Sequence, residues 1–183
     1  GGMDEVRIGF IGCGDNARGH QSRLLELDGA RLVAVCDLEE ERAAAAAAAT
    51  GAEAYADFRQ MLERDDLDAI GISVPVDAHG PLEMQIVQRR LPFFVEKPVA
   101  RHLDVAMEIE EAVAEAGLIT SVGYQLRYSG TADIAHDTLS GEIVSLAVGR
   151  YWSGSARNNT KDWVTDFARS GGQLLEQATH TID

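Results

Sequence analysis

The sequence predicts an α/β protein whose first part is a doubly wound parallel sheet. Short apolar runs alternate with helix-forming segments, the connections between them are short, and the first run ends in a glycine-rich turn. Strands that alternate with helices favour parallel pairing, because each helix returns the chain to the same end of the sheet through a right-handed crossover. After about residue 124 this alternation stops, so we expect a second region of α+β character.

The predicted strands are short apolar runs bounded by glycine, proline or polar residues, as buried parallel strands usually are. They cover residues 6–11, 31–36, 53–55, 67–74, 92–95 and 118–123. The predicted helices between them cover residues 18–27, 39–49, 57–63, 81–90 and 103–116. Asp57 is expected to cap one helix, and Pro81 suits the first turn of another. Gly51 and Gly117 follow two of the helices and are expected to end them.

The last third of the chain has a different pattern. We predict a helix over residues 131–139, a long strand over 142–152, a polar irregular stretch over 157–166 and a helix over 173–183. A single long strand with no strand after it cannot form a stable sheet. We therefore expect a nucleotide-binding domain over residues 1–124, and only the beginning of a substrate-binding domain over residues 125–183.

Composition excludes several classes of partner. The chain has 183 residues, 45% hydrophobic and 25% charged, which suits a folded globular protein. Acidic residues outnumber basic ones by 30 to 16, giving a formal net charge of −14. Such a surface repels phosphate backbones and anionic lipids, so we expect neither nucleic acid nor membrane as a partner. No apolar run could span a bilayer and no secretory signal is visible, so a cytoplasmic location is expected.

Cysteine and metal-ligand chemistry is not prominent in this sequence. Cys13 and Cys36 lie in apolar, strand-like runs and are expected to be reduced core residues rather than a disulfide. No cluster of histidine, cysteine and aspartate has the spacing of metal ligands, so we expect no metal.

The glycine-rich turn after the first strand points to a dinucleotide. Gly12, Gly14 and Ala17 fit the pattern G-x-G-x-x-G/A, and they stand between a predicted strand and a predicted helix. Gly12 allows the tight turn, Gly14 lets the backbone approach a pyrophosphate, and Ala17 permits close packing of helix and strand. The pyrophosphate would bind at the helix N-terminus, beside Asp15 and Asn16.

Asp37 directly follows the second strand, where an acidic residue is expected to bind the adenosine ribose 2′-hydroxyl. A carboxylate there repels a 2′-phosphate, which favours NAD over NADP, although Arg42 is a nearby base. The alternative role for Asp37 is to cap the following helix, but the glycine-rich turn favours the ribose.

Five segments, taken in order, resemble the glucose–fructose oxidoreductase/inositol dehydrogenase/rhizopine catabolism (Gfo/Idh/MocA) family. These are residues 6–20 (VRIGFIGCGDNARGH), Val74-Pro75 with His79, residues 95–98 (VEKP), residues 122–128 (VGYQLRY) and residues 171–183 (GGQLLEQATHTID). The resemblance implies a Rossmann domain followed by a sheet domain that lines the substrate site and builds homo-oligomers, usually dimers or tetramers. Members are usually nearly twice as long as this chain.

The resemblance also implies an NAD(P)-dependent oxidoreductase that acts on the hydroxyl or carbonyl group of a sugar or polyol. It places Lys97 beside the nicotinamide and the reacting oxygen, Glu96 near the nicotinamide ribose, and His180 as the usual proton acceptor. Glu176 stands where members often have aspartate. Glu176 and His180 are four residues apart and share one face of a helix, so the carboxylate could orient the imidazole or hold a substrate hydroxyl. Either Lys97 or His180 could be the formal base.

Several further residues each have two possible roles. Pro75 and His79 follow the fourth strand on the cofactor side, and His79 either positions the cofactor or caps the backbone. Tyr124, Gln125 and Arg127 contact substrate or nicotinamide, or pin the junction between the two parts of the chain. Trp163 borders a sugar site or packs at an interface. The Lys97–Pro98 bond is trans by base rate, whereas a cis bond would direct Lys97 into the cleft.

Two other functions remain open from the sequence. One is an NAD-dependent glycosidase that oxidises and re-reduces a sugar transiently, and the other is a nucleotide-binding regulator that has lost catalysis. The presence of both Lys97 and His180 favours an enzyme over the regulator.

Overall fold

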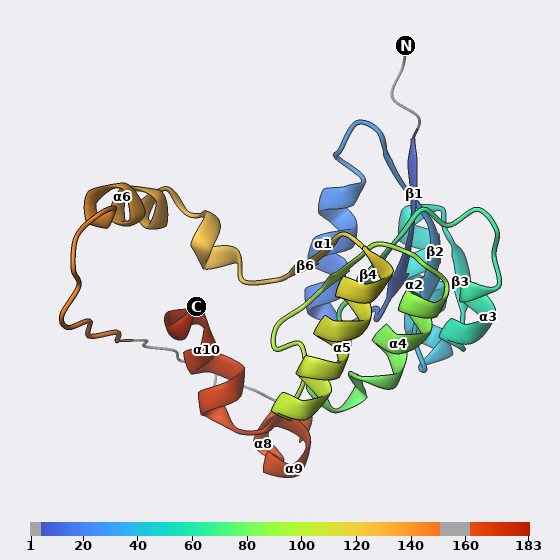
Figure 1. Cartoon of the computed structure of the whole chain (residues 1–183). Helices are drawn as coiled ribbons and strands as arrows, with labels where there is room; N and C mark the ends of the chain where they lie inside the picture. Colours follow the sequence, from blue (N-terminus) through green and yellow to red (C-terminus); the bar gives the residue numbers. More distant parts are fainter. Residues whose placement is uncertain (1–4, 151–161) are drawn as a thin grey trace.

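The computed structural model describes residues 5–150 and 162–183, and its centre is a parallel sheet (Figure 1). The strands are β1 (Val6–Ile11), β2 (Ala30–Cys36), β3 (Glu53–Tyr55), β4 (Ala69–Ile72), β5 (Phe93–Val95) and β6 (Thr120–Val122). They lie in the order β3-β2-β1-β4-β5-β6, and every neighbouring pair is parallel. This order confirms the predicted doubly wound fold, because the chain winds outward from β1 in both directions.

Helices cover both faces of this sheet. They are α1 (Asp15–Leu24), α2 (Glu40–Thr50), α3 (Phe58–Leu62), the short η1 (Val76–Ala78), α4 (Pro81–Gln88) and α5 (Leu103–Ala116). One apolar cluster joins α1 and α2 to β1 and β2, and a larger one joins α3, α4 and α5 to the other face. The two clusters thus pack the helices against the sheet, one on each face.

The core is packed closely enough to dictate a glycine. Phe10 on β1 is buried, and a Cβ atom at Gly71 on β4 would lie 2.4 Å from its ring. Because β1 and β4 are direct neighbours, with Phe10 opposite Gly71, the ring occupies the space that a side chain there would need.

The predicted caps are confirmed. Asp57 accepts a hydrogen bond of 2.9 Å from the backbone N–H of Arg59 and caps α3. Gly51, with a φ of 75°, ends α2, and Gly117 ends α5 in the same left-handed conformation. The prediction was wrong for the first helix, which begins at Asp15 rather than residue 18. The helix starts directly from the glycine turn, so its first N–H groups lie at the cleft.

The regular elements that the structure describes after the last strand are all helical. They are η2 (Gln125–Tyr128), α6 (Gly130–Leu139), α8 (Asp162–Thr165), α9 (Phe167–Ser170), the π-helical stretch η3 (Leu174–Ala178) and α10 (Thr179–Ile182). The strand predicted over 142–152 is wrong for residues 142–150, which form no strand. A strand requires a hydrogen-bonded neighbour, and the described residues provide none there. Residues 151–152 and 157–161 of the predictions lie outside the described residues.

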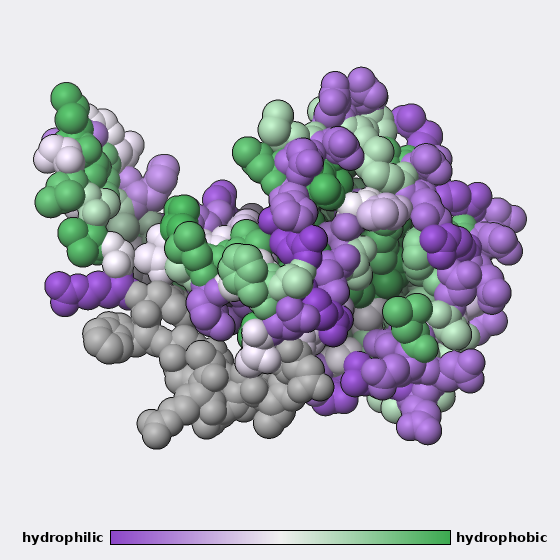
Figure 2. Space-filling view, turned by 90° about the horizontal axis from the view of Figure 1, so that it is seen from below, coloured by the Kyte–Doolittle hydropathy of each residue, from purple (hydrophilic) through white to green (hydrophobic). Residues whose placement is uncertain are grey.

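Helix α6 stands away from the sheet (Figure 1). Ile134 is 69% exposed and Leu139 is 49% exposed, and Figure 2 shows apolar side chains gathered over this helix at the left of the view. Such an apolar surface on a separate helix is typical of a face that packs against another part of a protein. None of the described helices is long and apolar enough to cross a membrane.

Candidate active site

A cleft of about 1180 Å³ opens above the carboxyl ends of the central strands. Ile11 at the end of β1, Cys36 at the end of β2 and Ser73 just after β4 all line it. In a doubly wound sheet the strands on the two sides of β1 are connected in opposite directions, which leaves a crevice where ligands bind. The cleft occupies this position.

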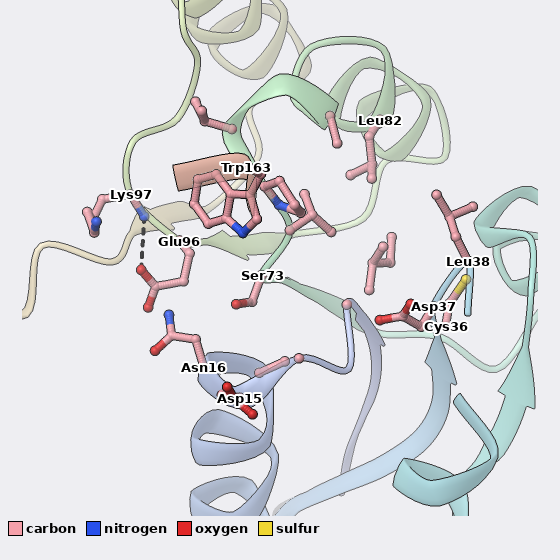
Figure 3. A pocket seen from close by; sticks show the side chains of 18 of the residues that line it. Asp15, Asn16, Cys36, Asp37, Leu38, Ser73, Leu82, Glu96, Lys97 and Trp163 are labelled. Carbon is pink, nitrogen blue, oxygen red and sulfur yellow. Dashed lines mark hydrogen bonds between the residues drawn. The ribbon is translucent and has the colours of Figure 1, made fainter. Parts of the chain in front are cut away.

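The glycine turn forms one wall of the cleft, with Gly12, Gly14, Asp15 and Asn16 all lining it (Figure 3). The two glycines differ in what requires them. Gly12 has a φ of 96°, and a Cβ atom there would lie 2.0 Å from the carbonyl oxygen of Ser73. Gly14 has an ordinary φ of −70°, and a Cβ atom there would meet nothing within 4 Å. The fold therefore requires Gly12, whereas the bare backbone at Gly14 faces open space.

Asp37 lies at the far end of the cleft and ties the turn to the next helix. Its Oδ2 accepts a hydrogen bond of 2.8 Å from the backbone N–H of Cys13, and its Oδ1 accepts one of 2.9 Å from that of Glu39. Glu39, not Asp37, is the N-cap residue of α2. A carboxylate has about four acceptor positions, so ribose hydroxyls can still donate to the same group. Asp37 therefore fits both a structural and a ligand-binding role.

The surroundings of Asp37 suit an adenosine group. Leu38 lines the cleft with 89% of its surface exposed, which leaves an apolar face for a ring to cover. Arg42 and Arg59 also line this end, and each is paired with a nearby acid. The Arg42 guanidinium is 3.2 Å from Glu39, which offsets the charge that a 2′-phosphate would need.

At the opposite end of the cleft, Lys97 meets the helix that carries His180. The Lys97 Nζ donates to the carbonyl oxygen of Glu176 at 2.8 Å and to its Oε1 at 3.0 Å. The Lys97 side chain is only 10% exposed and that of Glu176 only 12%. The Lys97–Pro98 peptide bond is cis. One end of the cleft is thus lined by Lys97, Glu176 and His180. Lys97 precedes Glu176 by 79 positions in the sequence.

His180 lies at the start of α10, immediately after the π-helical η3. Burial lowers the pKa of His180 below its usual range, and the nearby positive charge of Lys97 lowers it further. A π-helical stretch is rare and often marks a functional site, because the widened turn changes which side chains face the same way. The His180 imidazole thus lines the cleft near the Lys97 ammonium group, in surroundings that favour its neutral form.

Glu96 is held by a contact that sequence reasoning missed. The His20 Nε2 lies 2.6 Å from Glu96 Oε1, and the Lys97 backbone N–H donates to Glu96 Oε2 at 3.1 Å. Burial is the largest single influence and raises the pKa of Glu96, but the hydrogen bond and charge of His20, together with the backbone N–H and charge of Lys97, outweigh it, so the net pKa is lowered. The His20 ring lies between Phe10 and Phe94. No spacing in the sequence links positions 20 and 96, because the sheet brings them together.

The structure separates the candidates after β6 into two groups. Gln125 lines the cleft, whereas Tyr124 and Arg127 are not among its lining residues. The Tyr124 hydroxyl lies 3.0 Å from the hydroxyl oxygen of Thr179, and the Arg127 Nε donates to Asp183 at 3.0 Å. Both side chains therefore reach the helix of His180 and agree with the pinning role.

His79 and Pro75 also separate. Pro75 lines the cleft, whereas the His79 side chain is buried away from it. The His79 Nδ1 lies 2.6 Å from Glu83 Oε1, and Glu83 Oε2 accepts a hydrogen bond of 2.6 Å from the Gly80 backbone N–H. This pair ties the chain after η1 to the first turn of α4, which agrees with the structural role.

The short helices α8 and α9 also contribute side chains to the cleft. Trp163 on α8 lines it, as does Arg169 on α9, which sequence reasoning did not single out. The Arg169 Nε lies 2.8 Å from Asp77 and so ties α9 to η1. Among the residues that the structure describes, no three histidine, cysteine or acidic side chains gather as metal ligands.

Comparisons with known proteins agree with this geometry. The model of the Gfo/Idh/MocA family, described as an oxidoreductase family with an NAD-binding Rossmann fold, matches residues 6–124. An inositol 2-dehydrogenase from Rubrobacter xylanophilus is 32% identical over the whole chain, which covers 52% of that protein. A glycosyl hydrolase family 109 protein from Shewanella pealeana is 34% identical over 58% of the chain and 26% of its own length.

A solved structure shows the same fold. The myo-inositol dehydrogenase from Lactobacillus casei, in complex with NAD(H) and myo-inositol, has a TM-score of 0.69 and 30% identity over 75% of this chain and 43% of that one. The chain thus spans about half the length of the curated relative that it matches from end to end. Because the family model matches most of its residues, and these residues form a doubly wound parallel sheet, the chain belongs to the Gfo/Idh/MocA oxidoreductase family and contains its NAD-binding Rossmann fold.

Proposed function

We propose that this chain is the nucleotide-binding and catalytic part of an NAD-dependent dehydrogenase that oxidises a hydroxyl group of a neutral sugar or polyol. One observation carries the proposal: the cleft joins a dinucleotide-binding turn at one end to Lys97, Glu176 and His180 at the other. The names of the relatives point to an inositol as the first substrate to test. The nucleotide-binding domain is proposed to cover residues 1–124, and residues 125–183 to begin the substrate-binding domain.

The cofactor fits the residues at the end of the cleft that holds Gly14 and Asp37. The pyrophosphate would lie against the bare backbone of Gly14 at the start of α1, and the adenosine ribose would bind Asp37. When bound, NAD accepts a hydride from the substrate carbon, and this is the chemistry that the protein itself does not supply. Glu96, held by His20 and by the backbone of Lys97, would accept hydrogen bonds from the second ribose.

Proton transfer is assigned to His180, with Lys97 as its partner. Burial and the charge of Lys97 favour the neutral imidazole, which is the form that can accept the hydroxyl proton. The Lys97 Nζ donates hydrogen bonds to two oxygens of Glu176. An ammonium group has three N–H donors, so the third can donate to the substrate oxygen. Negative charge that develops on this oxygen would then be stabilised within a largely desolvated site. Glu176 fixes the position of Lys97 through the same contacts.

The test is turnover by the full-length protein that contains this chain. The protein is incubated with NAD⁺ and a panel of neutral polyols that begins with myo-inositol, and the absorbance of NADH is followed. We expect NADH to form with at least one polyol, and the variant His180→Asn to lose this activity. An NADP⁺ reaction measured in parallel should be slower, because Asp37 repels a 2′-phosphate.

A second candidate is supported by the Shewanella relative, whose name is that of a glycosyl hydrolase. A glycosidase that uses NAD transiently would release reducing sugar from a glycoside without net formation of NADH. The same protein is therefore assayed with nitrophenyl glycosides and bound NAD. Glycoside cleavage without NADH formation would replace the dehydrogenase by this function, and NADH binding without any turnover would favour a regulator.

A further inference from the structure

We propose that Tyr124 and Arg127 are positioning residues that hold His180 beside Lys97 by gripping the helix of His180 at Thr179 and Asp183. The proposal rests on the proposed function, because it concerns how the proton acceptor of that reaction is held. Neither residue is among those that line the cleft, so the role proposed here is to position His180.

The helical segment that carries His180 is held at three points. Glu176 lies within the π-helical η3, Thr179 begins α10, and Asp183 directly follows α10. Glu176 contacts Lys97, Thr179 contacts Tyr124, and Asp183 contacts Arg127. The three partners come from the Rossmann fold or directly follow it, since Lys97 comes after β5 and the other two come after β6.

His180 lies between these contacts. It directly follows Thr179, comes four residues after Glu176 and stands three residues before Asp183. A helix held at one point can still rotate about its axis or tilt, and either motion would displace the imidazole. Contacts on both sides of His180 remove these motions. These contacts, of Tyr124 with Thr179 and of Arg127 with Asp183, are called the clamp here, and they set the distance between the His180 ring and Lys97.

The backbone of this segment depends on such outside contacts. Residues Leu174–Ala178 form a π-helix, a conformation that is rarely stable by itself. Glu176 is within this stretch, whereas Thr179 and Asp183 belong to or follow the short α10, which is only one turn long. A single turn gains little from its own hydrogen bonds, so tertiary contacts must provide its order.

In the ion pair of Arg127 and Asp183, the Asp183 side chain is the more buried of the two. The Asp183 side chain is 12% exposed and that of Arg127 is 55% exposed. The guanidinium contacts the carboxylate through both Nε and a terminal nitrogen, a two-point arrangement that fixes orientation as well as distance. Removing Arg127 would leave a largely buried carboxylate unpaired, and the end of the helix would move toward water.

The hydroxyl contact between Tyr124 and Thr179 allows the sharpest experiment. In the full-length protein, Tyr124→Phe, Thr179→Val and the double variant are compared with wild type in a double-mutant cycle. We expect each single variant to lower kcat about 3- to 10-fold, which is the scale of one neutral hydrogen bond, while the KM for NAD⁺ is unchanged. The double variant should lose no more than either single one. Additive losses, or losses in KM alone, would overturn the proposal.

Matched variants separate positioning from folding. Thr179→Ser keeps the hydroxyl and should retain wild-type kcat, and Tyr128→Phe removes a hydroxyl from an exposed tyrosine of the same η2 segment and should have no effect. For the ion pair, Arg127→Lys keeps the charge and should be less damaging than Arg127→Ala. Asp133→Asn on the exposed α6 is the control for loss of a carboxylate. If Thr179→Ser were as damaging as Thr179→Val, the hydroxyl contact would not be the cause.

A readout without turnover keeps the proposal testable if the protein oxidises no polyol. The chain has five histidines, few enough for the imidazole signals to be followed by NMR, and His180→Asn identifies the signal of His180. In wild type its midpoint should lie below 6.5, because burial and Lys97 disfavour the charged ring. Loosening the clamp with Tyr124→Phe or Thr179→Val, neither of which changes a charge, should raise the midpoint toward 6.5. An unchanged midpoint in both variants would overturn the clamp, whatever the outcome for the dehydrogenase reaction.

Discussion

The Lys97 Nζ and the Glu176 Oε1 are 3.0 Å apart, although the two residues are separated by 79 positions in the chain. Both side chains are largely buried, so water screens their ion pair less than it would screen an exposed pair. A buried charge that loses its partner is costly, and this couples the two parts of the chain at the point where catalysis is proposed.

Substitution of Lys97 should therefore affect catalysis far more than nucleotide binding. We expect Lys97→Met to lower kcat by about 10²- to 10⁴-fold, the usual range for a group that assists proton transfer. Lys97→Arg should be nearly as damaging, because a planar guanidinium cannot occupy the position of a compact ammonium. Steady-state kinetics and NADH fluorescence titration measure the two effects. A Lys97→Met variant with more than about a tenth of wild-type kcat would contradict the assigned role.

The pH profile of alcohol oxidation should reflect His180. Because burial lowers its pKa below 6.5, the neutral form persists to lower pH than in a free histidine. The value of kcat/KM should fall with a midpoint below 6.5, because the imidazole then gains a proton and can no longer accept one. The measurement is kcat/KM across pH with saturating NAD⁺. A midpoint above 6.5 would point to another group as the base.

The two glycines of the turn should respond differently to alanine. Gly12→Ala places a Cβ atom 2.0 Å from Ser73 at a φ of 96°, so we expect it to destabilise the fold by about 1–3 kcal/mol. Gly14→Ala meets nothing, so its Tm should match wild type while NADH binding weakens. Thermal denaturation and fluorescence titration check both results, with Gly130→Ala as the control. Unimpaired NADH binding by Gly14→Ala would argue against a pyrophosphate at this turn.

Asp37 should matter for stability as well as for cofactor choice. Asp37→Ala removes the acceptor of two backbone N–H groups, so we expect a loss of about 1–3 kcal/mol in unfolding free energy together with weaker NADH binding. Asp37→Asn keeps one side-chain oxygen and should lose less. The preference for NADH over NADPH should fall in both variants, because the charge that repels a 2′-phosphate is gone. Equal Tm values for all three proteins would refute the structural part of this role.

The cysteines should be unreactive in the native protein. Burial raises the pKa of Cys13 to about 11 and that of Cys36 to about 12. At pH 8 roughly a thousandth or less of either thiol is then ionised, and only the thiolate reacts with iodoacetamide. Mass spectrometry should find almost no alkylation in native protein and complete alkylation of both residues in urea. Rapid native alkylation would show that the strand ends open readily.

Sequence reasoning succeeded where the signal is local. The strands, most helix ends and the Asp57 and Gly51 caps follow from hydrophobic pattern and cap chemistry, because these depend on neighbouring residues. It failed over residues 142–150, where an apolar, β-branched pattern is present but no partner strand is available within the described chain. Strand propensity describes a side chain that fits a sheet and cannot create the neighbour.

The contacts within the candidate site needed the structure. The positions of Lys97, Glu176 and His180 in one cleft agree with what the resemblance implied, although their roles are still proposals. The sequence did not predict the hydrogen bond between His20 and Glu96, or that from the Cys13 backbone N–H to Asp37. Both join residues that only the sheet brings together. For Tyr124 and Arg127, the sequence left two roles open, and the distances to Thr179 and Asp183 favour one of them.

The sheet order has a consequence for synthesis on the ribosome. β1 leaves the exit tunnel before every other strand, yet it occupies the middle of the sheet, between β2 and β4. Its first neighbour follows soon, but Ile8 must wait for Ala69 to emerge before its other edge is covered. During that interval the growing chain exposes an unpaired apolar edge, which is where nascent chains aggregate or recruit chaperones. The period in which β1 has an uncovered edge should therefore end when β4 emerges, well before the helix of His180 is made.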